Sequence, residues 1–146
     1  MRNLTLAFLS LIGLVLLNSC NNSNKHIGEW IIEDRGTKGY LILDANKNVT
    51  FSVDNYIVGG DNFEIDGNKT SIKYEIDYSK NPIWIDFIFY VTKNGTSETK
   101  NLSWKGIMRF ISDDKMEIRM DRKGNSERFT GFNPEDQQNT MVFIKK

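Results

Sequence analysis

The stretch Ser71-Ile72-Lys73-Tyr74-Glu75-Ile76-Asp77-Tyr78 decides the fold class of this chain. Every even position is apolar or aromatic, and every odd position is polar. Side chains of a β-strand point alternately to its two faces, so a strict period of two predicts a strand with one buried side and one solvent-facing side. An amphipathic helix would instead repeat its apolar residues every three or four positions. The segment therefore predicts β-structure.

Two later segments repeat this alternation. Residues 115–121 (KMEIRMD) alternate without exception, and the odd positions of residues 83–91 (IWIDFIFYV) are uniformly apolar. The even positions of the second segment include Asp86, so we expect the odd face to point inward and Asp86 to lie on the outer face. Turns rich in glycine, asparagine and aspartate separate such runs at short intervals. Ten strands are expected, near residues 29–34, 39–44, 48–53, 62–66, 70–78, 83–92, 104–112, 115–121, 126–131 and 140–145.

Consecutive strands joined by tight turns form an antiparallel meander. The sequence therefore predicts an all-β fold, an antiparallel meander of about 8–10 strands that closes or nearly closes into a barrel. The one helical signal is residues 133–136 (NPED), a cap-like asparagine followed by proline and two acids. This pattern predicts a single helical turn.

The chain begins with a segment of different character. Met1-Arg2-Asn3 gives a short positive head, and residues 4–17 are almost wholly apolar. As a helix, this apolar segment would span about 21 Å, which is short of the roughly 30 Å hydrocarbon core of a membrane. A secretory signal is therefore favoured over a transmembrane helix. The next residues, Leu17-Asn18-Ser19-Cys20, resemble the lipobox of bacterial lipoproteins, in which the cysteine is acylated and the preceding peptide is removed.

The lipobox resemblance implies a signal peptide at residues 1–19 and a lipidated Cys20 at the start of the mature chain. Cys20 is the only cysteine, so it has no partner for an internal disulfide. Two or three acyl chains would give stable membrane attachment. We expect a flexible tether at residues 20–26 and one domain at residues 27–146. The expected location is the cell envelope, on the periplasm-facing outer membrane, since no acidic run follows the cysteine.

The charge balance and the scarcity of histidine and cysteine argue against several classes of function. The 19 basic and 19 acidic residues balance, which argues against a nucleic-acid partner. His26 is the only histidine and is expected in the tether, and Cys20 is expected to be lipidated. Catalytic Ser-His-Asp and Cys-His arrangements, which need a histidine base beside the nucleophile, are therefore excluded. A tight zinc or copper site would need several histidine or cysteine ligands, which the sequence does not offer. Residues 44–48 imitate the start of an EF-hand, but Val49 replaces the required glycine, so we expect a hairpin turn there. No catalytic residue, metal or cofactor is predicted.

The start of the domain, Gly28-Glu29-Trp30, resembles the signature of the lipocalin and fatty-acid-binding (calycin) proteins, in which the tryptophan plugs one end of the barrel. Further segments look like a family of small lipocalin-like bacterial proteins, in the same order: 74–77, 80–82, 85–87, 106–108, 113–116 and 128–129. The resemblance implies a lipocalin-like barrel but no established activity. In lipocalins a late arginine stacks on the signature tryptophan, whereas the last strand here offers Lys145 and Lys146.

Bulky side chains lie on the predicted inward faces, where they either fill the barrel as ordinary core or line a pocket for one small ligand. The candidate ligand-binding residues are Trp30, Tyr74, Phe87, Phe89 and Phe110. The favoured prediction is a lipid-anchored, non-enzymatic envelope protein that binds a small apolar or amphipathic molecule in its barrel. In the alternative, these residues are ordinary core, and a protein partner docks on the outward aromatics Trp84 and Tyr90. A carboxylate-dependent hydrolase is the least favoured alternative.

Overall fold

The computed structural model describes residues 24–34, 37–53, 56–60, 63–93, 99–121 and 127–146, which form an all-antiparallel sheet of ten strands. The expected signal peptide, Cys20 and the tether up to residue 23 lie outside the described residues. The strands are β1 (Gly28–Asp34), β2 (Thr37–Leu43), β3 (Val49–Val53), β4 (Tyr56–Gly59), β5 (Phe63–Ile65), β6 (Asn68–Asp77), β7 (Ile83–Thr92), β8 (Thr99–Phe110), β9 (Lys115–Met120) and β10 (Thr140–Lys145).

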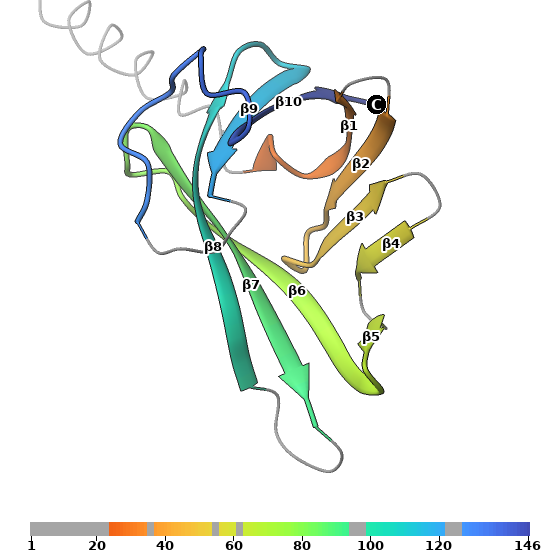
Figure 1. Cartoon of the computed structure of the whole chain (residues 1–146). Helices are drawn as coiled ribbons and strands as arrows, with labels where there is room; N and C mark the ends of the chain where they lie inside the picture. Colours follow the sequence, from red (N-terminus) through yellow and green to blue (C-terminus); the bar gives the residue numbers. More distant parts are fainter. Residues whose placement is uncertain (1–23, 35–36, 54–55, 61–62, 94–98, 122–126) are drawn as a thin grey trace, which may run out of the picture.

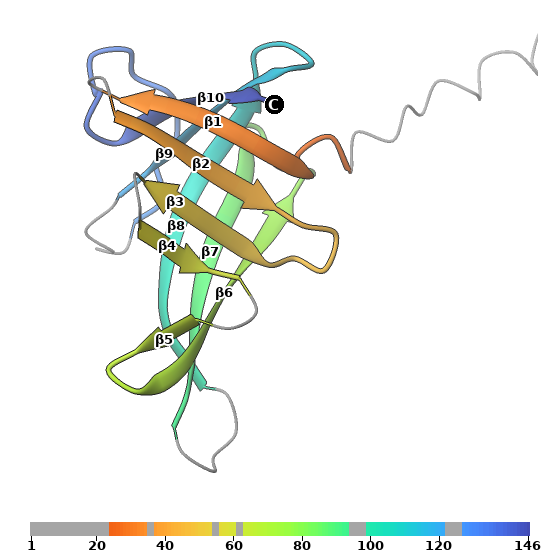
Figure 2. The same cartoon turned by 90° about the vertical axis from the view of Figure 1, so that its right-hand side faces the viewer.

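The strand order shows that the meander curls back on itself. The sheet runs β4-β3-β2-β1-β10-β9-β8-β7-β6-β5, so the first and last strands are neighbours. Trp30 on β1 lies opposite Lys145 on β10, and Ile31 lies opposite Ile144. Figures 1 and 2 show the resulting barrel, which is nearly closed. The predicted antiparallel meander barrel is confirmed.

The seam of the barrel lies between its two edge strands, β4 and β5. At one end the seam is bridged, since the main-chain nitrogen of Tyr74 donates to the carbonyl of Lys47 at 2.9 Å, and Asn48 pairs with Lys73. Strands β6, β7 and β8 are 10 to 12 residues long, and β3 and β4 have only five and four. The long strands therefore extend beyond the short ones, and the barrel is open on that side (Figures 1 and 2).

Two strand predictions are wrong. Residues 56–59 form β4, which was not expected because its apolar run is short and ends in two glycines. Residues 126–131 were expected to form a strand, but the described part, residues 127–131, has no strand. Its side chains instead contact the outer face of the barrel. The predicted helical turn at residues 133–136 is a turn without a helix, closed by a hydrogen bond from the Asp136 nitrogen to the Asn133 carbonyl at 3.1 Å.

The inward side chains form one apolar core. The predicted inward faces of β6, β7 and β9 are confirmed, because Ile72, Ile85, Phe87, Met116 and Ile118 are fully buried. Full burial of one such side chain contributes about 1.5–3 kcal/mol, so this core is the main source of stability.

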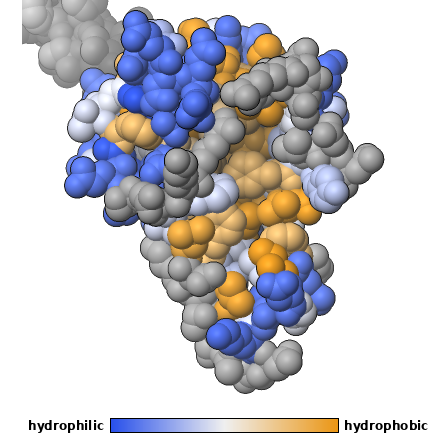
Figure 3. Space-filling model, in the orientation of Figure 1, coloured by the Kyte–Doolittle hydropathy of each residue, from blue (hydrophilic) through white to orange (hydrophobic). Residues whose placement is uncertain are grey.

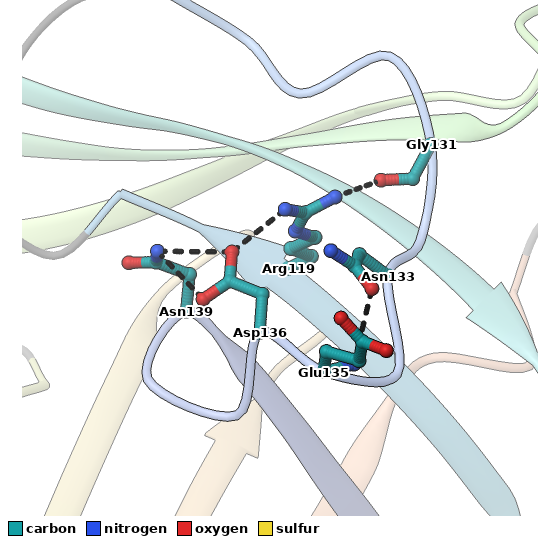
Figure 4. A network of polar contacts seen from close by, with 6 residues as sticks. All are labelled: Arg119, Gly131, Asn133, Glu135, Asp136 and Asn139. Carbon is teal, nitrogen blue, oxygen red and sulfur yellow. Dashed lines mark hydrogen bonds and ion pairs between the residues drawn. The ribbon is translucent and has the colours of Figure 1, made fainter.

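The connection between β9 and β10 is held against the outside of the sheet through Arg119 (Figure 4). The Arg119 guanidinium pairs with the Asp136 carboxylate at 2.6 Å and donates to the carbonyl of Gly131. Its guanidinium carbon lies 4.0 Å from the centroid of the Phe129 ring. Asn139 donates to both oxygens of the same carboxylate. One arginine on β9 therefore fixes three points of the connection, which explains why this segment does not add a strand.

Candidate functional site

Four aromatic side chains form a cluster that we call the aromatic opening: Phe51, Phe87, Phe89 and Trp104. The rings of Phe89 and Trp104 meet edge to face at 4.7 Å, and those of Phe51 and Phe87 do so at 5.4 Å. Phe87 is fully buried and the other three are half-buried, so the cluster reaches from the core to the surface. Figure 3 shows apolar side chains gathered in a hollow on the face that looks toward the viewer in Figure 1.

Strand register explains why these side chains meet. Phe87 on β7 lies opposite Trp104 on β8, and Phe89 lies opposite Leu102. The side chains of these two cross-strand pairs therefore all point to the inner face. Phe51 on β3 approaches them from across the barrel, at 6.4 Å from the Trp104 ring. Leu102 is 41% exposed, although it lies on the inner face. The projecting part of β7 and β8 therefore presents an apolar inner surface that the short strands leave uncovered.

The structure divides the five predicted ligand-binding residues among three places. Phe87 and Phe89 belong to the aromatic opening. Trp30 is fully buried, its indole nitrogen donates to the His26 carbonyl at 2.7 Å, and its ring lies 6.4 Å from that of Phe110. Trp30 and Phe110 thus plug one end of the barrel. Tyr74 lines a separate cavity, which is described below.

Two members of the aromatic opening, Phe51 and Trp104, were missed by the sequence analysis. Each lies in a predicted strand, and Trp104 is in phase with Phe110 on the same alternating face. That phase was the available signal for Trp104. The approach of Phe51 to Phe87 joins β3 to β7, and no local pattern carries that information.

Lys145 covers the plug from the last strand. Its ammonium lies 5.2 Å from the centroid of the Trp30 ring and donates to the Lys25 carbonyl at 3.1 Å. The lipocalin resemblance implied an arginine over this tryptophan. A lysine from β10 makes the cation–π contact here.

A second cavity, which we call the histidine cavity, has a volume of about 260 Å³. Its lining residues are Asn24, His26, Ile27, Ala45, Lys47, Tyr74, Ile76 and Tyr78. Sequence analysis placed His26 in the tether, but the side chain is only 5% exposed and packs against the barrel. Its Nδ1 lies 2.7 Å from the Tyr78 hydroxyl, and its Nε2 lies 2.9 Å from the Tyr74 hydroxyl.

These hydrogen bonds fix the positions of the protons. The Tyr74 hydroxyl donates to the carbonyl of Asp44 at 2.6 Å, so its oxygen must accept a hydrogen bond from the N–H at Nε2 of His26. A neutral imidazole carries one N–H, which leaves Nδ1 as the acceptor for the Tyr78 hydroxyl. The hydrogen bonds therefore form a chain in which Tyr78 donates to His26, His26 donates to Tyr74, and Tyr74 donates to the carbonyl of Asp44.

The environment keeps the imidazole of His26 and the phenols of Tyr74 and Tyr78 uncharged near neutral pH. Burial, and then the nearby charge of Lys145, lowers the pKa of His26 below its usual 6.5. Burial, and then the charge of Asp44, raises the pKa of Tyr74. Burial, and then Tyr74, raises the pKa of Tyr78 to about 12. The cavity thus offers neutral polar groups that respond to added charge.

The outer face of β7 carries the acid that stood out in the sequence. Asp86 lies on the outer face, and Arg128 contacts both of its carboxylate oxygens, at 2.7 and 2.9 Å. Arg128 also stacks on Trp84, with its guanidinium carbon 4.3 Å from the ring centroid. Asp86 therefore acts as an anchor for the connection between β9 and β10.

The described residues also bear on three further questions: the EF-hand-like segment, metal ligands and membrane-spanning helices. Asn48 donates its main-chain nitrogen to the Asp44 carboxylate at 2.7 Å, so the EF-hand-like segment is the expected hairpin turn. In the described part of the chain, no group of three or more histidine, cysteine or acidic side chains is placed to hold a metal. None of the helical structure in that part is long and apolar enough to cross a membrane.

No protein-family model, curated protein or solved structure in three separate comparisons matches the chain. The fold defines the class of protein as an all-antiparallel, nearly closed barrel. Functional inference therefore depends on the aromatic opening and the histidine cavity.

Proposed function

We propose that this protein is a lipid-anchored, non-enzymatic component of the bacterial cell envelope that binds a small apolar or amphipathic molecule at the aromatic opening. The observation that carries the proposal is the half-buried set of Phe51, Phe89 and Trp104 above the fully buried Phe87. The ring contacts hold these side chains in place before any ligand arrives. A pre-formed apolar site is typical of small-molecule binding.

The energetics of the opening favour an apolar ligand. Burial of apolar surface is worth about 25 cal/mol per Å², so a molecule that covers the exposed parts of Phe89, Trp104 and Leu102 gains binding free energy without refolding the barrel. Edge-to-face contact with aromatic rings adds about 0.5–1.5 kcal/mol for each ring of the ligand. Barrels of similar strand number are wide enough to hold one small ligand.

Protein docking on the outer aromatics is less well supported. Trp84 has two cations over its ring, since the guanidinium of Arg128 lies 4.3 Å and the ammonium of Lys80 lies 5.0 Å from the centroid. The ammonium of Lys73 lies 5.6 Å from the Tyr90 ring. These outer rings already have partners within the chain, whereas the opening presents apolar surface that the other described residues leave uncovered.

The envelope location depends on the lipobox resemblance of residues 17–20, and the type of barrel on the lipocalin resemblance that begins at Gly28-Glu29-Trp30. The plugged end, where Trp30 meets Phe110 and Lys145, is consistent with the second resemblance. A lipid anchor would hold the barrel next to a membrane, where apolar and amphipathic molecules are abundant.

The test uses a chain that starts at residue 24, whose folding is first checked by far-UV circular dichroism, and the fluorescent apolar probe N-phenyl-1-naphthylamine. We expect saturable enhancement of probe fluorescence in the unmodified barrel. Trp104→Ala removes the ring that contacts Phe89 and Phe51. The probe should therefore bind at least about tenfold more weakly, which corresponds to about 1.4 kcal/mol.

Trp84→Ala is the matched control, because it removes the same side chain from the outer face of the neighbouring strand. This variant should bind the probe like the unmodified barrel. Equal loss in both variants, or no saturable binding by a folded barrel, would refute the proposed site.

A further inference from the structure

We propose that the histidine cavity is a second binding site, for a small carboxylate with a short apolar chain, and that the bound carboxylate accepts a hydrogen bond from Tyr78 while His26 takes up one proton. This site shares no residue with the aromatic opening, so the inference stands independently of the function proposed above.

The charge of the cavity selects an anion. Among the described residues that line it, Lys47 is the only one that carries a full charge, and none is acidic. Lys145 on β10 adds a second positive charge that acts on His26. The carboxylate of Asp44, which acts on Tyr74, is held by the main-chain and side-chain nitrogens of Asn48 in the hairpin turn. A carboxylate in the cavity would meet Lys47, which lines it, directly.

Other charged groups near the site already have an ion-pair or hydrogen-bond partner. Lys25, next to His26 in the chain, forms an ion pair with Asp113 at 2.7 Å. Asp77, next to Tyr78, accepts hydrogen bonds from the hydroxyl and main-chain nitrogen of Ser79. Burial, and then the charge of Lys145, therefore opposes protonation of the imidazole until an anion in the cavity compensates for them.

The hydrogen-bond chain explains how the Tyr78 hydroxyl can change from an acceptor to a donor toward the ligand. Without a ligand, the Tyr78 hydroxyl donates to Nδ1 of His26, and only its lone pairs remain for a ligand. When a proton from solvent joins Nδ1, this nitrogen donates to the Tyr78 oxygen, and the hydroxyl proton turns toward the cavity. The only bond formed is the N–H bond at Nδ1, and its proton comes from a hydronium ion of the solvent, which is left as water. The Nε2 donor to Tyr74 is the same in both states.

The remaining lining and the volume limit the size of the ligand. Ile27, Ala45 and Ile76 provide an apolar wall, which suits the aliphatic part of a carboxylate. The volume of about 260 Å³ lies below the range of about 300–1,000 Å³ for drug-sized ligands. Short-chain carboxylates fit this space, whereas a full-length fatty acid would exceed it.

The experiment follows the imidazole of His26 by NMR in the full chain, kept in non-ionic detergent, and uses sodium butyrate as the probe. His26 is the only histidine, so its resonances need no assignment by mutation. We expect butyrate to shift these resonances saturably and to raise the pH at which they titrate. Between the pKa values of the free and the bound state, butyrate affinity should fall about tenfold for each unit of rising pH.

Butyramide, which has the same shape but no charge, should cause no comparable shift. Lys47→Gln should weaken butyrate binding, and Lys69→Gln on the exposed face of β6 is the control with the same change in net charge. Tyr78→Phe should weaken butyrate binding and remove its dependence on the protonation of His26. If butyrate leaves the titration of His26 unchanged, or if butyramide acts equally, the inference is wrong.

Discussion

At the scale of single residues, the hydrogen bonds of His26 explain how one side chain joins the start of the chain to the barrel. The imidazole contacts Tyr74 of β6 and Tyr78, which directly follows that strand, 48 and 52 positions further along the chain. The carbonyl of the same residue accepts a hydrogen bond from the Trp30 indole. A neutral imidazole satisfies this arrangement, so protonation must disturb it.

Protonation of His26 predicts a stability that depends on pH. The pKa of His26 is lower in the folded state than its unfolded value of 6.5, so the unfolded chain binds the proton first. The free energy of unfolding should therefore be at its full value above pH 6.5 and decline as the pH falls through the folded pKa. Urea unfolding at a series of pH values measures this decline.

His26→Gln provides the control for that measurement. Glutamine keeps a side-chain donor and acceptor but does not titrate in this range, so the decline that starts near pH 6.5 should disappear. A parallel decline in both proteins would assign the effect to acidic groups instead.

The residue scale also shows where the sequence analysis failed. His26 was visible as the only histidine, but its burial depends on Tyr74 in β6 and on Tyr78 just after it, both of which are distant in the sequence. The alternation of residues 71–78 correctly predicted that Tyr74 faces inward, whereas Tyr78 lies just beyond the end of β6. No local pattern shows that the residue at the end of a polar segment fills the space between them.

At the scale of elements, β4 and the seam were the least predictable part of the fold. Alternation identified the long strands, because each carries enough inward residues to show the period. Strand β4 has four residues, of which Tyr56 and Ile57 are exposed, so its pattern is indistinct. Its position depends on the Gly60 nitrogen, which donates to the Val49 carbonyl at 2.8 Å.

Gly59 gives a direct test of this edge. Its φ is +96°, and a Cβ atom there would lie 2.2 Å from the Val49 carbonyl oxygen, so alanine meets both backbone strain and a collision. We expect Gly59→Ala to lower the free energy of unfolding by about 2 kcal/mol or more.

Gly131→Ala is the control, because nothing lies within 4 Å of its Cβ position. This variant should stay within about 0.5 kcal/mol of the unmodified chain in urea unfolding. A Gly59→Ala variant of unchanged stability would show that β4 is not held as described.

At the scale of the whole molecule, the sequence correctly predicted the class of fold, because alternation and turns recur along most of the chain. It did not predict that the candidate aromatic residues separate into a plug and an opening. Trp30 and Phe110 meet at one end, while Phe87 and Phe89 meet Phe51 and Trp104 elsewhere. That separation depends on how β1 to β4 are placed over β6 to β8.

The anchor is a prediction for the whole molecule that the sequence alone supports. Cells fed an alkyne-bearing palmitate should incorporate the label into the unmodified protein. Cys20→Ala should abolish the label, because this chain has no other cysteine to acylate. Ser23→Ala, which changes a nearby residue of the tether, should be labelled normally. An unlabelled wild-type protein would contradict the anchor.

The central claim, that the barrel carries a small apolar or amphipathic molecule, is tested most directly by native mass spectrometry. The protein would be purified from its own host in non-ionic detergent, and any bound molecule would be identified after organic extraction. We expect one co-purifying molecule in the unmodified protein and in Trp84→Ala, and its loss from Trp104→Ala. A folded, unmodified protein at its bare mass would contradict the account.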